Sequence, residues 1–100
     1  NRHITYYTDV FGFSGEKQYR VKLRMGRLAM RVLMEEYGVE EHQFVITDDS
    51  HWLFSTLVCS YQGVGRFVMG LIQDIDIVDS PNFKEYLRRD LNILTEKLTD

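Results

Sequence analysis

The feature that most constrains this chain is a run of seven residues, 19–25, in which apolar and cationic side chains alternate without a break. The apolar members are Tyr19, Val21, Leu23 and Met25, and the cationic members are Arg20, Lys22 and Arg24. Because successive side chains of a β-strand point to opposite faces of its sheet, this pattern predicts a half-buried strand. One face of that strand belongs to a core, and the other face is basic.

The rest of the chain switches between helical and extended periods. Apolar residues recur every three or four positions in three stretches, which predicts helices at 27–37, 64–72 and 83–98. Three further stretches are rich in β-branched and aromatic residues, which predicts strands at 44–47, 52–59 and 75–77. The turn-forming residues 48–51 make the first two of these strands a hairpin. Gly38 is placed to end the first helix, and Ser80 followed by Pro81 is placed to begin the last one.

This order of elements predicts an α+β fold. The first six elements match the ferredoxin-like βαββαβ arrangement, with an antiparallel sheet of strand order 4-1-3-2, and a C-terminal helix is added to it. Residues 1–18 show no sustained period, so we interpret them as an irregular arm or linker and expect the folded domain at 19–100. Two helices cover one face of such a sheet, and its second face stays free for a partner or for the last helix.

Composition narrows the function classes. Hydrophobic residues make up 44% of the 100 residues, enough for one packed domain. The net charge of −3 argues against polyanion binding by the chain as a whole but leaves a local basic patch open. The single cysteine, Cys59, excludes an internal disulfide and suits a reducing compartment. We expect a cytoplasmic domain with no membrane partner and, because the chain begins with Asn1, a piece of a longer protein.

The stretch Gly63-Val64-Gly65 resembles the start of a phosphate-binding loop but lacks the rest of one. A dinucleotide fingerprint needs a third glycine where Val68 stands, and a P-loop needs a glycine followed by Lys and Ser or Thr. We interpret the two glycines as relieving crowding where the second helix leaves the third strand. Asp48, Asp49 and His51 have turn composition, and Cys59 has no nucleophile signature. We therefore expect no catalytic site, no metal, no cofactor and no enzymatic activity.

The row of Arg20, Lys22 and Arg24 is the strongest candidate for contact with a ligand or partner, and Arg66 is a weaker candidate. Cations on an open sheet face can bind an anion, a nucleic acid or an acidic protein surface. The alternative is ion pairing across strands, for which Asp76 on the fourth strand is suitably placed. The first strand carries no open-face aromatics to stack bases, which disfavours an RNA-recognition module.

With these elements placed, the chain resembles the C-terminal extension (WCX) domain of WYL-domain bacterial transcriptional regulators. The likeness covers most of the chain and rests on four stretches in a fixed order. They are Tyr6–Ser14; Val21–Met25 with a helix that ends in Glu35-Glu36-Tyr37; Gly65–Leu71 with Ile75–Val78; and Ser80-Pro81 with the leucine-striped helix. One departure is Val78-Asp79-Ser80-Pro81, where the family pattern has a more apolar lead into the proline.

The resemblance implies a modular regulator with an N-terminal winged helix-turn-helix, a central WYL domain and then this extension. In such proteins the WYL domain senses a nucleic acid or nucleotide ligand. The extension helps to form a homodimer and couples the signal to DNA binding elsewhere in the protein. The alternative is a stand-alone ferredoxin-like domain that binds a small-molecule effector at a homodimer interface.

Overall fold

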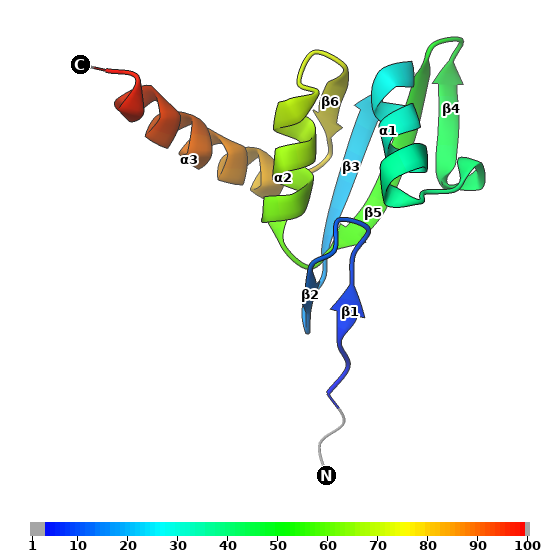
Figure 1. The fold of residues 1–100 in the computed structure, drawn as a ribbon, viewed down its shortest axis with the longest axis horizontal. Helices are drawn as coiled ribbons and strands as arrows, with labels where there is room; N and C mark the ends of the chain where they lie inside the picture. The colour runs from blue at the N-terminus through cyan, green and yellow to red at the C-terminus, as the bar shows by residue number, and fades with distance from the viewer. Residues whose placement is uncertain (1–3, 100) are drawn as a thin grey trace.

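A computed structural model describes residues 4–99 and shows one four-stranded antiparallel sheet, three α-helices and a small two-stranded arm (Figure 1). The strands of the sheet are β3 (Tyr19–Met25), β4 (Phe44–Asp48), β5 (His51–Val58) and β6 (Ile75–Val78). The helices are α1 (Arg27–Tyr37), α2 (Tyr61–Gly70) and α3 (Pro81–Lys97), and a short 3-10 helix, η1 (Glu41–Gln43), precedes β4. The predicted α+β class, with four strands and three helices, is confirmed.

The sheet has the strand order β4-β5-β3-β6, so β3 and β5 are central. The alternation in β3 explains the position of the core, because Val21, Leu23 and Met25 are fully buried. In register, Leu23 lies opposite Phe54 on β5 and Ile77 on β6. Helices α1 and α2 both lie over this face of the sheet (Figure 1).

The two ends of α1 are stabilised in different ways. At its C-terminus Gly38 adopts a left-handed φ of 69°, as the sequence predicts. At its N-terminus Gly26 offers no side chain, and Oδ2 of Asp74 accepts a hydrogen bond of 2.7 Å from the N–H of Ala29. The carboxylate therefore caps the helix from the loop between α2 and β6, a contact that no local pattern predicts.

The arm is more regular than the sequence predicts. Strands β1 (Tyr7–Thr8) and β2 (Ser14–Gly15) pair antiparallel, so the expectation of an irregular segment is corrected for these residues. The buried carboxylate of Asp9 accepts hydrogen bonds from the N–H groups of Phe11, Phe13 and Cys59. Because Cys59 follows β5, Asp9 ties the arm to the sheet. The domain boundary at residue 18 stays a prediction.

The two glycines of the Gly-x-Gly stretch lie within α2, which begins at Tyr61 after the N-cap Ser60 and therefore earlier than predicted. A Cβ on Gly63 would lie 2.5 Å from Cβ of Phe11, and one on Gly65 would lie 3.2 Å from the Tyr86 ring. Crowding at the two glycines is therefore confirmed, but its expected place is corrected, because the close neighbours belong to the arm and to α3 and not to the preceding strand.

Helix α3 begins at Pro81 with Ser80 as its N-cap residue, as predicted, but the Ser80 side chain makes no capping hydrogen bond to the helix. Asp79 adopts a positive φ of 46°, and the Ser80 hydroxyl serves the edge of the sheet. It donates to the carbonyl of Val78 and accepts from the N–H of Lys22. The hydroxyl therefore extends the β3–β6 ladder by one further hydrogen bond.

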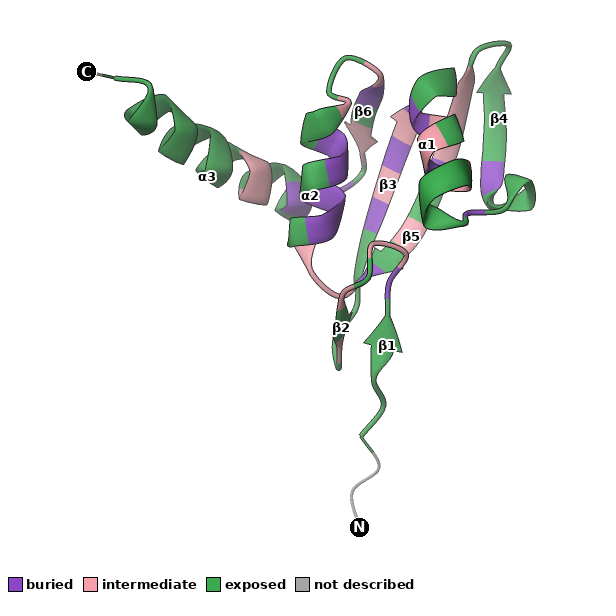
Figure 2. Cartoon of the chain, in the orientation of Figure 1, coloured by how far each residue is buried: buried purple, intermediate pink, exposed green. Residues whose placement is uncertain are grey.

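Only the first two turns of α3 pack on the rest of the chain. Phe83 is fully buried, and its ring lies 5.4 Å from that of Tyr61. Every residue from Arg88 to Thr99 is exposed (Figure 2). The helix and the arm both project from the sheet, which accounts for a radius of gyration of 14.9 Å. A compact domain of this length would have a radius of gyration of about 13 Å.

Candidate interaction surface

The cationic row lies on the sheet face that no helix covers, as the alternation in β3 predicts. Arg20 is exposed, whereas Lys22 and Arg24 are half-buried. Side chains of the neighbouring strands share this open sheet face, which we define by the following residues: Arg20, Lys22, Arg24, Val45, Leu53, Ser55, Leu57, Asp76 and Val78. Leu57 and Val45 expose 40% and 62% of their surface, so the open sheet face is mixed aliphatic and charged.

Two of the three cations on this face have acidic neighbours. The Arg24 guanidinium lies 3.0 Å from a carboxylate oxygen of Asp48 and 3.5 Å from one of Asp76. The Lys22 ammonium lies 3.9 Å from Asp79. The ion-pairing alternative therefore holds for Arg24 with Asp76, and such solvent-exposed pairs contribute little stability. Within residues 4–99, Arg20 forms no ion pair and is the least compensated member of the row.

Asp48 connects the open sheet face to the β4–β5 turn. Its carboxylate accepts a hydrogen bond of 2.9 Å from the N–H of Ser50 and lies 2.9 Å from Nδ1 of His51. The Ser50 hydrogen bond, with His51 and Arg24 acting in the same direction, lowers the pKa of Asp48 from 3.8 to about 2. Asp48 and His51 thus organise a turn, in agreement with the interpretation from sequence.

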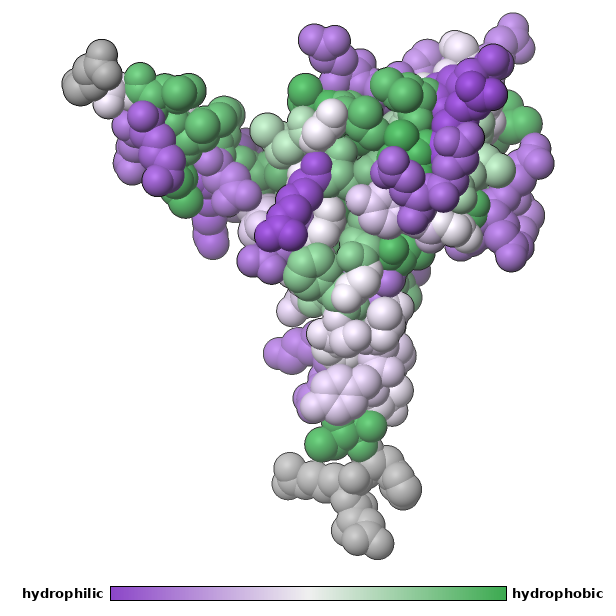
Figure 3. All heavy atoms as spheres, in the orientation of Figure 1, coloured by the Kyte–Doolittle hydropathy of each residue, from purple (hydrophilic) through white to green (hydrophobic). Residues whose placement is uncertain are grey.

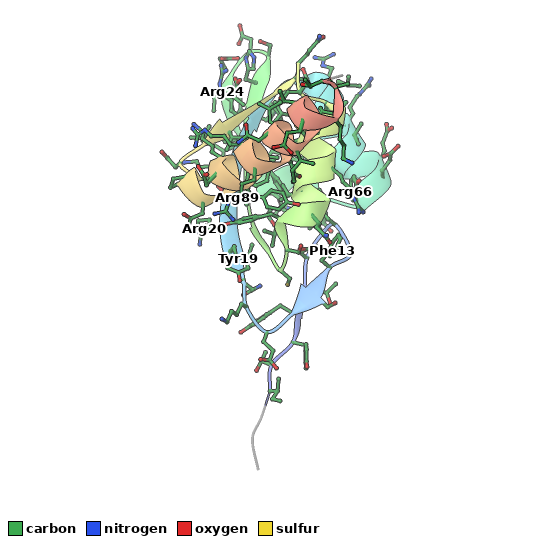
Figure 4. All side chains as sticks on the ribbon, turned by 90° about the vertical axis from the view of Figure 1, so that its left-hand side faces the viewer. Phe13, Tyr19, Arg20, Arg24, Arg66 and Arg89 are labelled. Carbon is green, nitrogen blue, oxygen red and sulfur yellow. The ribbon has the colours of Figure 1, made fainter. Side chains whose placement is uncertain are left out.

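Arg66 does not join the row. It lies on α2, which covers the opposite face of the sheet, and Figure 4 shows it on the other side of the molecule from Arg20 and Arg24. Its neighbours include Tyr86 and Asp90 of α3. Burial raises the pKa of Tyr86, the Asp90 charge adds to this rise, and the Arg66 charge opposes it. Three of the four predicted binding residues therefore lie together in the row on β3, and the fourth, Arg66, lies apart from them on α2.

The structure also contains an apolar groove that the sequence interpretation missed. The groove measures about 520 Å³ and lies between the end of α2, strand β6 and α3. Its apolar lining comprises Met69, Ile72, Ile75, Ile77, Leu87 and Leu91. The only signal in the sequence is the length of the leucine stripe, which continues beyond the part of α3 that packs on α2.

Chemically, these surfaces are suited to binding. The open sheet face presents guanidinium and ammonium groups among aliphatic side chains, and its members as defined above include no aromatic residue. Within residues 4–99, no helix has the length and apolar character needed to cross a bilayer. Comparison with known proteins identifies no relative, because no family model, no curated protein and no solved structure matches the chain.

Proposed function

We propose that this chain is a non-enzymatic assembly domain of a cytoplasmic WYL-type bacterial transcriptional regulator. It docks through the open sheet face on an acidic surface of the WYL domain of the same protein. The observation that carries the proposal is the open sheet face itself, where aliphatic side chains and a partly uncompensated cationic row lie together without a covering layer. An antiparallel sheet can keep a polar face in water, but the exposed aliphatic side chains of Val45 and Leu57 on this face favour a cover.

A protein partner suits this face better than a nucleic acid does. Binding to phosphates depends on free cations, and stacking of bases depends on aromatic side chains. Here Lys22 and Arg24 already have carboxylate neighbours, and the open sheet face offers Leu57 and Val45 where a stacking platform would need rings. Protein interfaces combine an apolar core with a polar rim, and arginine is enriched in them.

The topology supports a ferredoxin-like classification within this proposal. When the strands of the sheet are numbered by themselves, β3, β4, β5 and β6 become strands 1 to 4, and the order β4-β5-β3-β6 becomes 2-3-1-4. Read from the other edge, this order is 4-1-3-2, the arrangement expected for the extension of WYL regulators. In the complete regulator this domain helps to form a homodimer and passes the signal of a nucleic acid or nucleotide ligand, bound by the WYL domain, to the DNA-binding end.

The proposal is tested first by sequencing the DNA upstream of the codon for Asn1, which is expected to encode a WYL domain and a helix-turn-helix. The encoded WYL domain is then titrated with the 100-residue chain in a calorimeter. Exchanging Arg20 for Glu is expected to weaken binding about tenfold, because it places a repulsive charge opposite an acidic surface. The matched control is Arg66→Glu on the opposite side of the molecule, which is expected to bind as the wild type does.

Two results would contradict this function. The first is an upstream sequence without a WYL domain, and the second is unchanged affinity of the Arg20→Glu variant. A titration with single-stranded DNA at two salt concentrations separates the competing class of partner. Tight binding that weakens steeply with salt and is lost in Arg20→Glu would identify the open sheet face as a nucleic-acid surface instead.

A further inference from the structure

We infer that two copies of this chain pair through the distal part of α3, with the two helices antiparallel. The inference specifies the dimer contained in the proposed function and rests on that function. Its first support is an apolar stripe that continues past the packed turns of the helix. Leu91, Leu94 and Leu98 expose 54%, 45% and 75% of their surface. A contiguous apolar stripe of this kind marks an interaction face.

The spacing of the stripe suits a second helix. Leu87, Leu91, Leu94 and Leu98 follow one another at steps of four, three and four residues. These steps are those of alternating core positions in a heptad, which form the seam of a two-stranded coiled coil. A two-fold axis between Leu91 and Leu94 would pack Leu91 against the partner's Leu94 and Leu87 against the partner's Leu98. Such an interface is closed and uses the same surface on both copies.

Charge selects the antiparallel direction and a second copy of the chain. Asp90 and Lys97 lie seven residues apart on the same flank of the stripe. In an antiparallel pair this flank of one helix faces the same flank of the partner helix. Asp90 of each copy then lies opposite the partner's Lys97, so the contact occurs once at each end of the seam. A parallel pair would instead place Asp90 opposite the uncharged Thr95. The flanking charges of one helix are therefore complementary to those of a reversed copy of itself.

The shape of the monomer allows this approach. Helix α3 projects away from the sheet, with hydrophobic and hydrophilic side chains gathered on different sides of it (Figures 1 and 3). Leu91 also lines the groove with Met69 and Ile72, which expose 47% and 52% of their surface. A partner helix that seats its Leu98 against Leu87 would cover the mouth of the groove. The dimer therefore buries apolar surface of α2 as well as of α3.

The test is sedimentation equilibrium of the 100-residue chain over a concentration series. The wild type is expected to form a dimer. Exchanging Leu94 for Asp is expected to raise the dimer dissociation constant at least about 30-fold, the loss typical of a central interface residue. Circular dichroism checks that the variant keeps its helices and its unfolding transition, because Leu94 is exposed in the monomer.

A charge exchange tests the register without removing apolar surface. Asp90→Lys and Lys97→Asp are each expected to weaken the dimer, because like charges then face each other, and the double variant is expected to restore it. A wild-type chain that stays monomeric up to about 1 mM overturns the inference. So does a dimer that Leu94→Asp leaves intact, or a double variant no better than the single ones.

The outcomes also distinguish this inference from the proposed function. Leu94→Asp is expected to bind the WYL domain as the wild type does, because the open sheet face is untouched. Loss of the dimer with WYL binding retained supports both conclusions. A dimer that depends on Arg20 and not on Leu94 would overturn the α3 seam and leave the docking domain in place. Failure of WYL binding with an α3-dependent dimer would overturn the proposed function alone.

Discussion

Gly63 shows how one missing side chain determines where the arm lies. Its Cα faces the arm, and an added Cβ would lie 2.5 Å from Cβ of Phe11 and 2.9 Å from the ring of Phe13. Phe11 in turn packs on Tyr37 and Phe67, with ring centroids 5.2 and 5.6 Å away. The glycine therefore lets an aromatic arm approach the backbone of α2 closely.

Exchanging Gly63 for Ala is expected to lower the free energy of unfolding by about 1–3 kcal/mol, because the new methyl group overpacks this contact. Urea unfolding measures the change. The matched control is Gly70→Ala in the same helix, where no atom outside the neighbouring helix backbone lies within 4 Å of an added Cβ. The control is expected to be neutral or stabilising by up to about 1 kcal/mol. Equal effects at both positions would show that helix propensity, and not the arm, governs Gly63.

The stability that Asp48 gives to the β4–β5 hairpin depends on pH. The pKa of Asp48 is lowered to about 2 from 3.8, so the folded state favours the ionised carboxylate. The stabilising contribution is therefore complete above pH 3.8 and is lost as the pH falls through about 2. Urea unfolding at several pH values measures the free energy of unfolding. The wild type is expected to be more stable than Asp48→Asn above this pH window, and the difference is expected to disappear as the pH falls through it.

The control for this titration is Asp49→Asn in the same turn. Within the described part of the chain, the Asp49 side chain makes no hydrogen bond or ion pair with another side chain. This variant is expected to follow the pH dependence of the wild type. A constant difference between wild type and Asp48→Asn from pH 4 to pH 2 would contradict the lowered pKa.

At the scale of the elements, one amphipathic pattern in α3 extends through two environments, the core and the solvent. Its first turns belong to the core, where Phe83 and Tyr86 contact Tyr61. Its distal turns contact solvent along Leu94 and Leu98. The sequence shows one continuous stripe, because the spacing of apolar residues reports the period of a helix and not the identity of its neighbour.

Removing residues 90–100 is therefore expected to change the free energy of unfolding by less than about 1 kcal/mol, because exposed residues contribute little to the monomer. The measurement is chemical unfolding at concentrations where the wild type is monomeric. The matched comparison is Phe83→Ala, which removes a buried ring and is expected to cost about 3–5 kcal/mol. A truncation as costly as Phe83→Ala would show that the distal half of α3 packs on its own sheet.

At the scale of the whole molecule, the chain consists of one layered core with two projections. Figure 1 shows the arm and α3 leaving the sheet in different directions, and the molecule measures 54 by 41 by 24 Å. The open sheet face and the exposed stripe of α3 are formed by different elements, β3 to β6 and α3. In the proposed function, one of these surfaces docks within the chain and the other pairs with a second copy.

Much of this fold could be predicted from sequence, and the reasons are local. The run 19–25 forms β3 with the predicted bounds, and α1 spans 27–37 with its glycine cap, because strand and helix periods are properties of neighbouring residues. For the candidate site, the sequence placed Arg20, Lys22 and Arg24 on one face and indicated Arg66 as a separate, weaker candidate. It could not tell on which side of the molecule Arg66 lies, since that depends on which face α2 covers.

The sequence by itself determined the four strands of the main sheet, the three helices, their order and the basic side of β3, because each follows from a side-chain period over a few residues. Only the tertiary structure decided which carboxylates meet Arg24, how Asp74 caps α1 and where the stripe of α3 leaves the core. These contacts join residues far apart in the chain, and they depend on packing angles that no local pattern encodes. The physical reason is that the spacing of apolar residues determines which face of a strand or helix is buried. Tertiary packing determines which residues of other elements contact that face.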